Sequence, residues 1–144
     1  KSSFIRLQIQ EANVQEAARF LGHDYFAIGS VQEGQKRGRS IGYPTANIMV
    51  ADKKSLPNGV FAVEVESSHG RHYGMANVGA RPSFEEKPPS LEVHVFDFAD
   101  NLYGQNVTVH FKKFLRSQIK FSGIEEVKAQ LIEDERQARK VLGL

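Results

Sequence analysis

Glycines and cations are interspersed in one short stretch whose residue types suit the binding of phosphate groups. Its members are Gly34, Lys36, Arg37, Gly38, Arg39 and Gly42. Glycine lets the backbone adopt positive φ and approach a ligand closely, so that backbone N–H groups and cations can surround a polyphosphate. The stretch therefore predicts a nucleotide-phosphate cradle. A basic, solvated hairpin loop is the alternative, because these residue types are also common in turns.

This stretch differs from the two common phosphate-binding loops. A P-loop requires Gly-x4-Gly-Lys-Ser/Thr leading into a helix, whereas residues 34–40 offer Gly-x3-Gly-Arg-Ser, one residue shorter and with Arg in place of Lys. The dinucleotide-binding pattern Gly-x-Gly-x-x-Gly is absent. Pro44 biases Tyr43 toward an extended backbone, so a helix is not expected to begin there. Arg39 is the best single phosphate contact, because a guanidinium fork matches phosphate oxygens.

Two polar side chains follow directly and have the chemistry of magnesium and phosphate ligands. Thr45 and Asn47 lie two positions apart on a segment expected to be extended, so their side chains project to the same side. We expect Thr45 to give its hydroxyl to Mg²⁺, and Asn47 to hold a phosphate or the water shell of the metal. An ordinary strand threonine and a turn asparagine are the alternatives.

Glu92 is the carboxylate that best fits the role of a base. It stands among Val93, Val95 and Phe96 in a predicted strand, where a lone carboxylate needs a reason to exist. Phosphoryl transfer to an alcohol requires a phosphate cradle, a metal and a carboxylate that accepts the hydroxyl proton. We therefore predict that Glu92 is the general base, and an outward-facing strand glutamate is the alternative.

The elements that would position these residues are mostly short strands. Two-residue periodicity predicts strands at residues 26–31, 46–50, 61–66, 73–77, 91–98 and 107–111. Residues 67–70 supply a turn between two of them. About six short strands with hairpin-length turns indicate an antiparallel barrel or sandwich.

Both ends of the chain show helical spacing instead. Asn13 is a predicted N-cap with Glu16 three positions later, and Gly22 ends that helix. Ser122 and Glu125 predict a capping box for a second helix, which should lie across the barrel. Its apolar positions are Val127, Leu131, Ala138, Val141 and Leu142.

Composition narrows the class of protein. A chain of 144 residues with 40% apolar and 25% charged residues is enough for one domain with its own core. Without cysteine there is no disulfide framework or thiolate nucleophile. The net charge of +2 is too small to indicate nucleic acid. With no long apolar run, we expect no membrane span and a cytoplasmic location.

The order of the motifs resembles that of riboflavin kinases, which transfer the γ-phosphate of ATP to riboflavin and make FMN. The resemblance extends from about residue 25 to residue 140 and is carried by residues 34–47, 76–84, 91–98, 102–104, 114–116 and 120–121. It implies a mainly β fold, a six-stranded antiparallel Greek-key barrel with a short N-terminal helical arm and a C-terminal α-helix packed on the barrel. It also implies Mg²⁺ as the cofactor, with ATP as co-substrate.

The same resemblance assigns residues to roles. It implies that Glu92 is the catalytic glutamate and that Thr45 and Asn47 hold the metal-bound triphosphate. The remaining nucleotide-side positions that it implies are Gly34, Gly38, Arg39, Asn77, Asp97 and Tyr103. On the flavin side it implies Arg116, Lys120 and Phe121, between the last strand and the helix.

Residues 1–24 resemble the end of the adenylyltransferase module in bacterial bifunctional riboflavin kinase/FAD synthetases. The chain would then divide into an N-terminal helical arm, residues 1–24, and a kinase barrel with its helix, residues 25–144. The expected partners are riboflavin and FMN, ATP and ADP, and, in the full-length protein, an N-terminal FMN adenylyltransferase module. No nucleic acid or membrane is expected.

Two other functions fit a small barrel. A binding module for single-stranded nucleic acid would use the basic loop and aromatic side chains, although the phenylalanines lie mostly inside predicted strands. A redox barrel with permanently bound FMN would leave the glycine–arginine stretch without a role. Zinc chemistry is disfavoured because a zinc site needs three or four convergent ligands and the chain has no thiolate.

Overall fold

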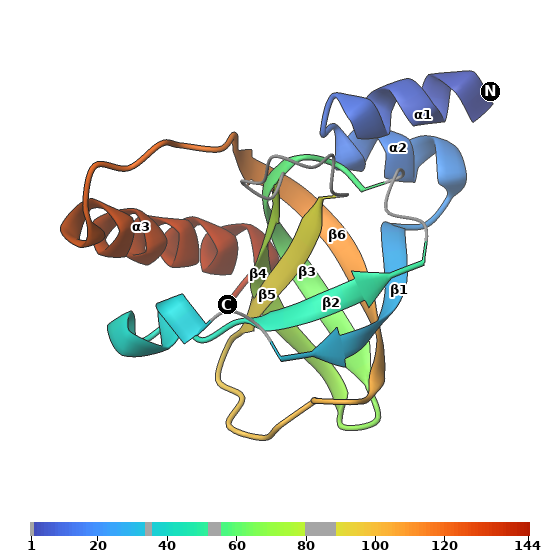
Figure 1. The fold of residues 1–144 in the computed structure, drawn as a ribbon. Helices are drawn as coiled ribbons and strands as arrows, with labels where there is room; N and C mark the ends of the chain where they lie inside the picture. Colours follow the sequence, from blue (N-terminus) through green and yellow to red (C-terminus); the bar gives the residue numbers. More distant parts are fainter. Residues whose placement is uncertain (1, 34–35, 52–55, 80–88) are drawn as a thin grey trace.

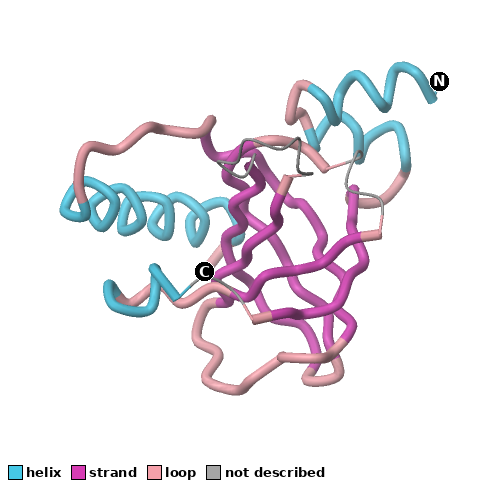
Figure 2. Tube along the Cα trace, in the orientation of Figure 1, coloured by secondary structure: helices cyan, strands magenta, loops and turns pink. Residues whose placement is uncertain are grey.

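The computed structural model describes residues 2–33, 36–51, 56–79 and 89–144. Within these ranges six antiparallel strands close into a barrel in the order β1-β2-β5-β4-β3-β6 (Figure 1). The strands are β1 Tyr25–Gln32, β2 Ala46–Val50, β3 Gly59–Ser67, β4 Gly70–Gly79, β5 Ser90–Val95 and β6 Asn106–Arg116. The mainly β six-stranded barrel implied by the resemblance is therefore confirmed. The tube view shows the helices outside the strands (Figure 2).

Apolar side chains at alternate positions of the strands fill the interior of the barrel. Phe61 of β3 and Phe111 of β6 are fully buried, and their rings meet edge to face with centroids 5.2 Å apart. Leu91 and Val93 of β5 are buried on the same side. Because side chains alternate between the two faces of a strand, the residues between these positions face away from the interior. That outward face carries the candidate active site.

Most predicted strands have somewhat different ends in the structure, and the C-terminal ends of two of them differ most. The expected strand 91–98 stops at Val95, because Phe96 and Asp97 form a turn in which Asp97 has a φ of 54°. β6 continues to Arg116, with register shifts opposite β3 near Phe61 and Val63. The predicted turn at residues 67–70 is confirmed, since Ser67 pairs with Gly70.

The N-terminal arm contains two helices, α1 (Ser2–Gln10) and α2 (Val14–Leu21). The predicted cap of α2 is confirmed, because the Asn13 side chain accepts a hydrogen bond from the Glu16 N–H at 3.4 Å. Gly22 ends α2 in the left-handed conformation, with a φ of 81°. Only α2 was predicted from the apolar periodicity. In Figure 1 the arm lies at one end of the barrel, away from the C-terminal helix α3.

Helix α3 (Ile124–Leu142) lies against the outer face of the barrel, as predicted. Its predicted capping box is wrong by one position: Gly123 is the N-cap, and Ser122 binds the carboxylate of Glu126 with its hydroxyl at 2.7 Å. Ala138 is fully buried against the barrel, whereas Val141 is 39% exposed. No described helix is long and apolar enough to cross a membrane.

Candidate active site

Three polar side chains lie in register across the adjacent strands β2, β5 and β4. Asn47 pairs with Glu92 on one side, and Glu92 pairs with Asn77 on the other. Cross-strand partners project from the same face of a sheet, so the three side chains form one row. The next pair, Ile48 and Leu91, is buried inside the barrel. The row therefore faces outward, into a cavity that α3 covers.

Thr45 joins this row immediately before β2 begins. Its hydroxyl donates a hydrogen bond to Oε1 of Glu92 at 3.3 Å. Thr45, Asn47 and Glu92 line the same cavity. The structure therefore brings the predicted base and the two predicted metal ligands together. Glu92 does face outward from the barrel, but it is only partly exposed because the cavity encloses it.

The glycine-rich stretch folds partly as the 3₁₀ helix η1 (Lys36–Ile41). Tyr43 donates its N–H to the carbonyl of Gly38 at 2.7 Å, and a Cβ at position 38 would collide with the Tyr43 carbonyl oxygen. Gly42 has a φ of 87°, which favours glycine. These two glycines are thus required by the fold of the stretch itself. The predicted contact Gly34 lies outside the described residues.

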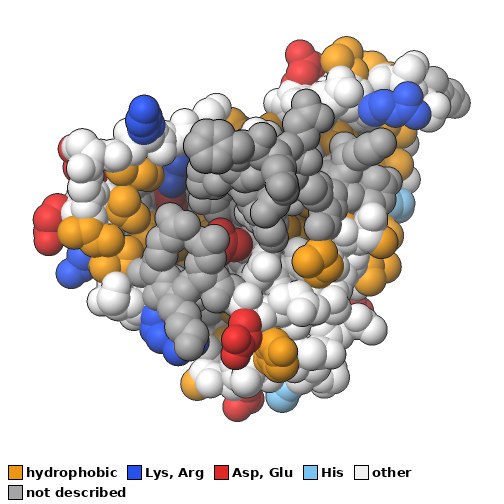
Figure 3. All heavy atoms as spheres, in the orientation of Figure 1, with side chains coloured by type: hydrophobic (Ala, Val, Ile, Leu, Met, Phe, Trp, Pro, Cys, Tyr) orange, Lys and Arg blue, Asp and Glu red, His pale blue; other side chains and the backbone are white. Residues whose placement is uncertain are grey.

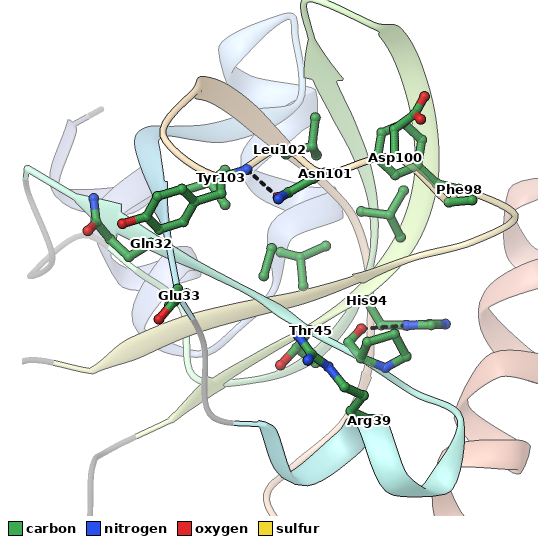
Figure 4. Close-up of a pocket in the computed structure, with 16 residues that line it drawn as sticks. Gln32, Glu33, Arg39, Thr45, His94, Phe98, Asp100, Asn101, Leu102 and Tyr103 are labelled. Carbon is green, nitrogen blue, oxygen red and sulfur yellow. Dashed lines mark hydrogen bonds between the residues drawn. The ribbon is translucent and has the colours of Figure 1, made fainter.

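A first cavity, the loop cavity, opens beside the segment that follows β5. Its volume is about 500 Å³. Arg39 extends from η1 toward Thr45 at one side, and Tyr103 lies at the other (Figure 4). The Tyr103 N–H donates to the Asn101 side chain at 2.8 Å. Two of the predicted nucleotide-side residues, Arg39 and Tyr103, therefore line one cavity.

A second cavity, the helix cavity, lies between α3 and the outer face of the barrel and has a volume of about 640 Å³. Polar groups line one part of it, and the row Asn47–Glu92–Asn77 belongs to them. The apolar part comprises Val60, Met75, Ile124, Val127 and Leu131. The space-filling view shows hydrophobic side chains gathered over α3 (Figure 3). An apolar wall with a few convergent polar groups is the usual character of a small-molecule site, and both cavities fall in the range of about 300–1,000 Å³.

The two cavities meet at three residues, since Glu33, Thr45 and His94 line both. His94 holds its place through Nδ1, which donates to the Pro44 carbonyl at 2.8 Å. A carbonyl oxygen only accepts, so this bond fixes a proton on Nδ1. The arrangement provides two separate binding volumes with the Thr45–Glu92 pair at their junction.

Arg116, predicted on the flavin side, lines the helix cavity but is already engaged. Its guanidinium forms two hydrogen bonds of 2.8 Å with the carboxylate of Asp134, which is 2% exposed. Gln130 donates a further bond to Asp134 at 2.9 Å. Phe121 lies 6.0 Å from the Arg116 guanidinium, and neither Lys120 nor Phe121 lines either cavity.

Asp97 is the predicted nucleotide-side residue that the structure places apart from both cavities. It forms a bidentate pair with Arg139 of α3, with both N–O distances at 3.1 Å. Hydrogen bonding from Arg139 is the main reason that the pKa of Asp97 lies below its ordinary value. Asp97 therefore joins the turn after β5 to α3.

Gln118 is a lining residue that no motif marked. Its amide donates to the Asn77 side chain and to the Val78 carbonyl, both at 2.8 Å, so it ties the segment after β6 to β4. It lies beyond the strand, where two-residue periodicity gives no information. Asp134 was missed because a single acidic residue on a charged helix carries no distinctive pattern.

Comparison with known proteins gives one consistent family. Residues 21–142 match the family model described as Flavokinase, riboflavin kinase. The bifunctional riboflavin kinase/FMN adenylyltransferase of Bacillus subtilis is 40% identical over 141 residues, which cover 95% of this chain and 45% of the relative. The protein of the same name from Escherichia coli strain K12 is 38% identical over 144 residues, which cover 99% of this chain and 46% of the relative. The chain thus spans about 45% of the length of these curated relatives.

Solved structures agree on the fold. A crystal structure from Streptococcus pneumoniae, named a macrolide-efflux protein, superposes with a TM-score of 0.88 at 36% identity, over 96% of this chain and 46% of that one. Riboflavin kinase from Trypanosoma brucei superposes with a TM-score of 0.62 at 22% identity, over 82% of this chain and 79% of that one, which supports the fold alone. With the family model matching most of its residues, the chain belongs to the riboflavin kinase family.

Proposed function

We propose that this chain is an ATP:riboflavin 5′-phosphotransferase that transfers the γ-phosphate of ATP to the ribityl 5′-hydroxyl of riboflavin. The observation that carries the proposal is the Thr45–Glu92 hydrogen bond of 3.3 Å at the junction of two cavities. A kinase for a small alcohol needs two substrate volumes that meet at a base and a phosphate-binding group. The family supports the choice of riboflavin and ATP as substrates.

The linings of the two cavities suit different substrates. The helix cavity has the apolar wall that an isoalloxazine ring needs, and Gln118 offers a polar anchor beside it. Asn77, which the resemblance implied on the nucleotide side, lines this cavity and not the loop cavity, so we propose it as a second anchor. The loop cavity has Arg39, a cation suited to phosphate, together with Tyr103. We therefore assign riboflavin to the helix cavity and ATP to the loop cavity.

In the proposed reaction Glu92 is the general base. The 5′-hydroxyl oxygen forms a new bond to the γ-phosphorus, and the bond from that phosphorus to the bridging β,γ-oxygen breaks, so that ADP leaves. The proton of the attacking hydroxyl passes to the Glu92 carboxylate. Most of the catalysis in such a transfer comes from positioning and from charge neutralisation. The pairing of Glu92 with both Asn47 and Asn77 holds the backbone that carries the base.

The donor set at the junction suits Mg²⁺. Thr45 uses its only proton in the bond to Glu92, so both lone pairs of its hydroxyl oxygen stay available for a cation. Asn47 lines only the helix cavity, but it is the cross-strand partner of Glu92 and adds an amide oxygen beside it. Mg²⁺ prefers hard oxygen ligands and usually shares them with substrate phosphates. We propose that Thr45 and Asn47 hold Mg²⁺, which when bound neutralises charge on the triphosphate.

Residues 1–24 are proposed to be the arm that joins this barrel to an FMN adenylyltransferase module in the full-length protein. The length of the relatives and their bifunctional names support that assignment. Packing also supports it, because α1 and α2 contact each other and α2 contacts β1 and β6, whereas the cavities lie elsewhere.

One assay tests the proposal. The chain is incubated with riboflavin, ATP and Mg²⁺, and the products are separated by chromatography. FMN and ADP in equal amounts are expected, and a chelator should abolish both. Formation of ADP without FMN, or no turnover of either substrate, would contradict the proposed reaction. A redox barrel would instead purify with FMN bound and show no dependence on ATP.

A further inference from the structure

The segment from Tyr43 to Thr45 connects η1 to β2 and is held from both sides. On the barrel side, His94 of β5 donates from Nδ1 to the Pro44 carbonyl at 2.8 Å. The same imidazole meets the Tyr43 ring nearly edge to face, with ring centroids 5.1 Å apart. On the other side, the hydroxyl of Tyr43 reaches α3. Thr45 therefore follows directly on two residues whose positions are fixed by tertiary contacts.

The contact with α3 is a short, charge-assisted hydrogen bond. The Tyr43 hydroxyl donates to Oε1 of Glu135 at 2.7 Å, and the two residues are 92 positions apart in the sequence. Burial, followed by the bond to Glu135, raises the pKa of Tyr43 to about 12. The bond from Tyr43 is the main cause of a lowered pKa of Glu135. The phenol is therefore protonated and the carboxylate ionised near neutral pH, which is the state this bond requires.

Glu135 is itself held in place by a network. Arg139 donates from Nε to Oε2 of Glu135 at 2.8 Å, and its other two nitrogens bind Asp97. The Arg139 guanidinium also lies over the Phe96 ring, 4.5 Å from its centroid. Glu135 thus uses one oxygen for Tyr43 and the other for an arginine that anchors α3 to the turn after β5.

We infer that Tyr43 and Glu135 are positioning residues, which hold the segment 43–45 on α3 so that Thr45 faces Glu92 at the junction of the two cavities. The inference rests on the proposed function. Neither residue exchanges a proton with substrate. Their effect is exerted through Pro44 on Thr45, and hence on the use of Mg·ATP. A small displacement of a group that orients a phosphate is costly in an in-line transfer.

The position of Tyr43 distinguishes this role from direct substrate contact. Tyr43 lines the helix cavity, which is assigned to riboflavin, whereas Thr45 lines both cavities. A direct contact of the hydroxyl with riboflavin would therefore appear as a raised KM for riboflavin. A positioning role predicts a change in the KM for Mg·ATP and in kcat. The ion pairs of Arg116 with Asp134 and of Arg139 with Asp97 keep α3 docked when the tyrosine bond is lost.

The test compares Tyr43→Phe, Glu135→Ala and the double variant with the unsubstituted chain. Tyr43→Phe keeps the ring on His94 and removes only the hydroxyl. We expect kcat/KM for Mg·ATP to fall roughly tenfold in each single variant, with the KM for riboflavin changed less than about twofold. The double variant should be no more than about twofold worse than the more impaired single variant, because both changes break one bond. Glu133→Gln, on the exposed Arg136 pair of the same helix, is the matched control and should leave all constants unchanged.

The possible outcomes distinguish a failure of the proposed function from a failure of the positioning role alone. If the unsubstituted chain makes no FMN, the proposed function fails and the positioning role fails with it. If it makes FMN but Tyr43→Phe has unchanged constants, the positioning role alone fails. It also fails if only the KM for riboflavin rises, or if the losses in the double variant multiply. Thermal unfolding of each variant checks the fold, and Tyr43→Phe with a native transition and impaired Mg·ATP use supports the inference.

Discussion

The row Asn47–Glu92–Asn77 on the outer face of the barrel and the segment 43–45 meet at the hydrogen bond between Thr45 and Glu92, yet different contacts hold them in place. Asn47, Glu92 and Asn77 are placed by backbone pairing of β2, β5 and β4. The segment 43–45 is placed by side-chain bonds to α3 and His94. A register error would move every side chain of a strand to the other face, so the row is strongly specified. The segment has no such register, so its position depends on each of the side-chain contacts that hold it.

The largest effect is expected from a substitution in the row that removes a carboxylate and leaves the structure unchanged. Glu92→Gln keeps the size of the side chain and an oxygen that can accept from Thr45, but it removes the proposed base. We expect kcat to fall by roughly 10²–10⁴, the usual loss for a general base. Binding of Mg·ATP, measured by calorimetry, should survive. Retention of most of the activity would remove Glu92 from the role of base.

A second change tests how α3 is anchored. Asp134→Asn leaves the partly buried Arg116 guanidinium without its charged partner, which has a side chain only 3% exposed. Breaking such a pair from one side is strongly destabilising, and we expect a loss of about 3 kcal/mol in the free energy of unfolding. Urea denaturation measures this loss. A change below about 1 kcal/mol would mean that the pair does not anchor the helix.

The difference between the two regions also explains what could be predicted from the sequence. Alternation of apolar residues located all six strands, and the shared parity of Thr45 and Asn47 indicated a common side. The register that sets Glu92 beside Asn47 and Asn77 was not visible, because β2 and β5 are neighbours in the barrel although they are far apart in the sequence. Pairing between such strands depends on the closed fold and not on local pattern.

The contacts of α3 were less predictable still. The bond between Tyr43 and Glu135 joins residues 92 positions apart, and neither residue type is unusual in its local setting. Asp97 was predicted to lie on the nucleotide side, and its pairing with Arg139 after the turn that ends β5 early was not foreseen. Side-chain pairs across a fold leave no periodicity, so one sequence alone does not report them.

The next prediction concerns the residue where the two regions meet. Thr45→Ala removes the hydroxyl that binds Glu92 and, in the proposed function, Mg²⁺. We expect kcat/KM for Mg·ATP to fall by roughly 10- to 100-fold, since a bond to a charged group is lost at the phosphate. Riboflavin binding, measured by quenching of flavin fluorescence, should change much less. Equal loss for both substrates would count against the assignment of Thr45.

The smallest expected effect comes from the N-terminal arm, which lies outside both regions. Asn13 caps α2 through its oxygen and donates from Nδ2 to the Gln8 side chain of α1 at 3.0 Å. Asn13→Ala should therefore cost about 1 kcal/mol of unfolding free energy, the usual value of an N-cap. Because the arm contributes no residue to either cavity, the KM values for riboflavin and Mg·ATP should stay unchanged. A change in either KM in this variant would mean that the arm influences the row Asn47–Glu92–Asn77 through β1 or β6, and the site could then no longer be treated as a property of the barrel and α3 alone.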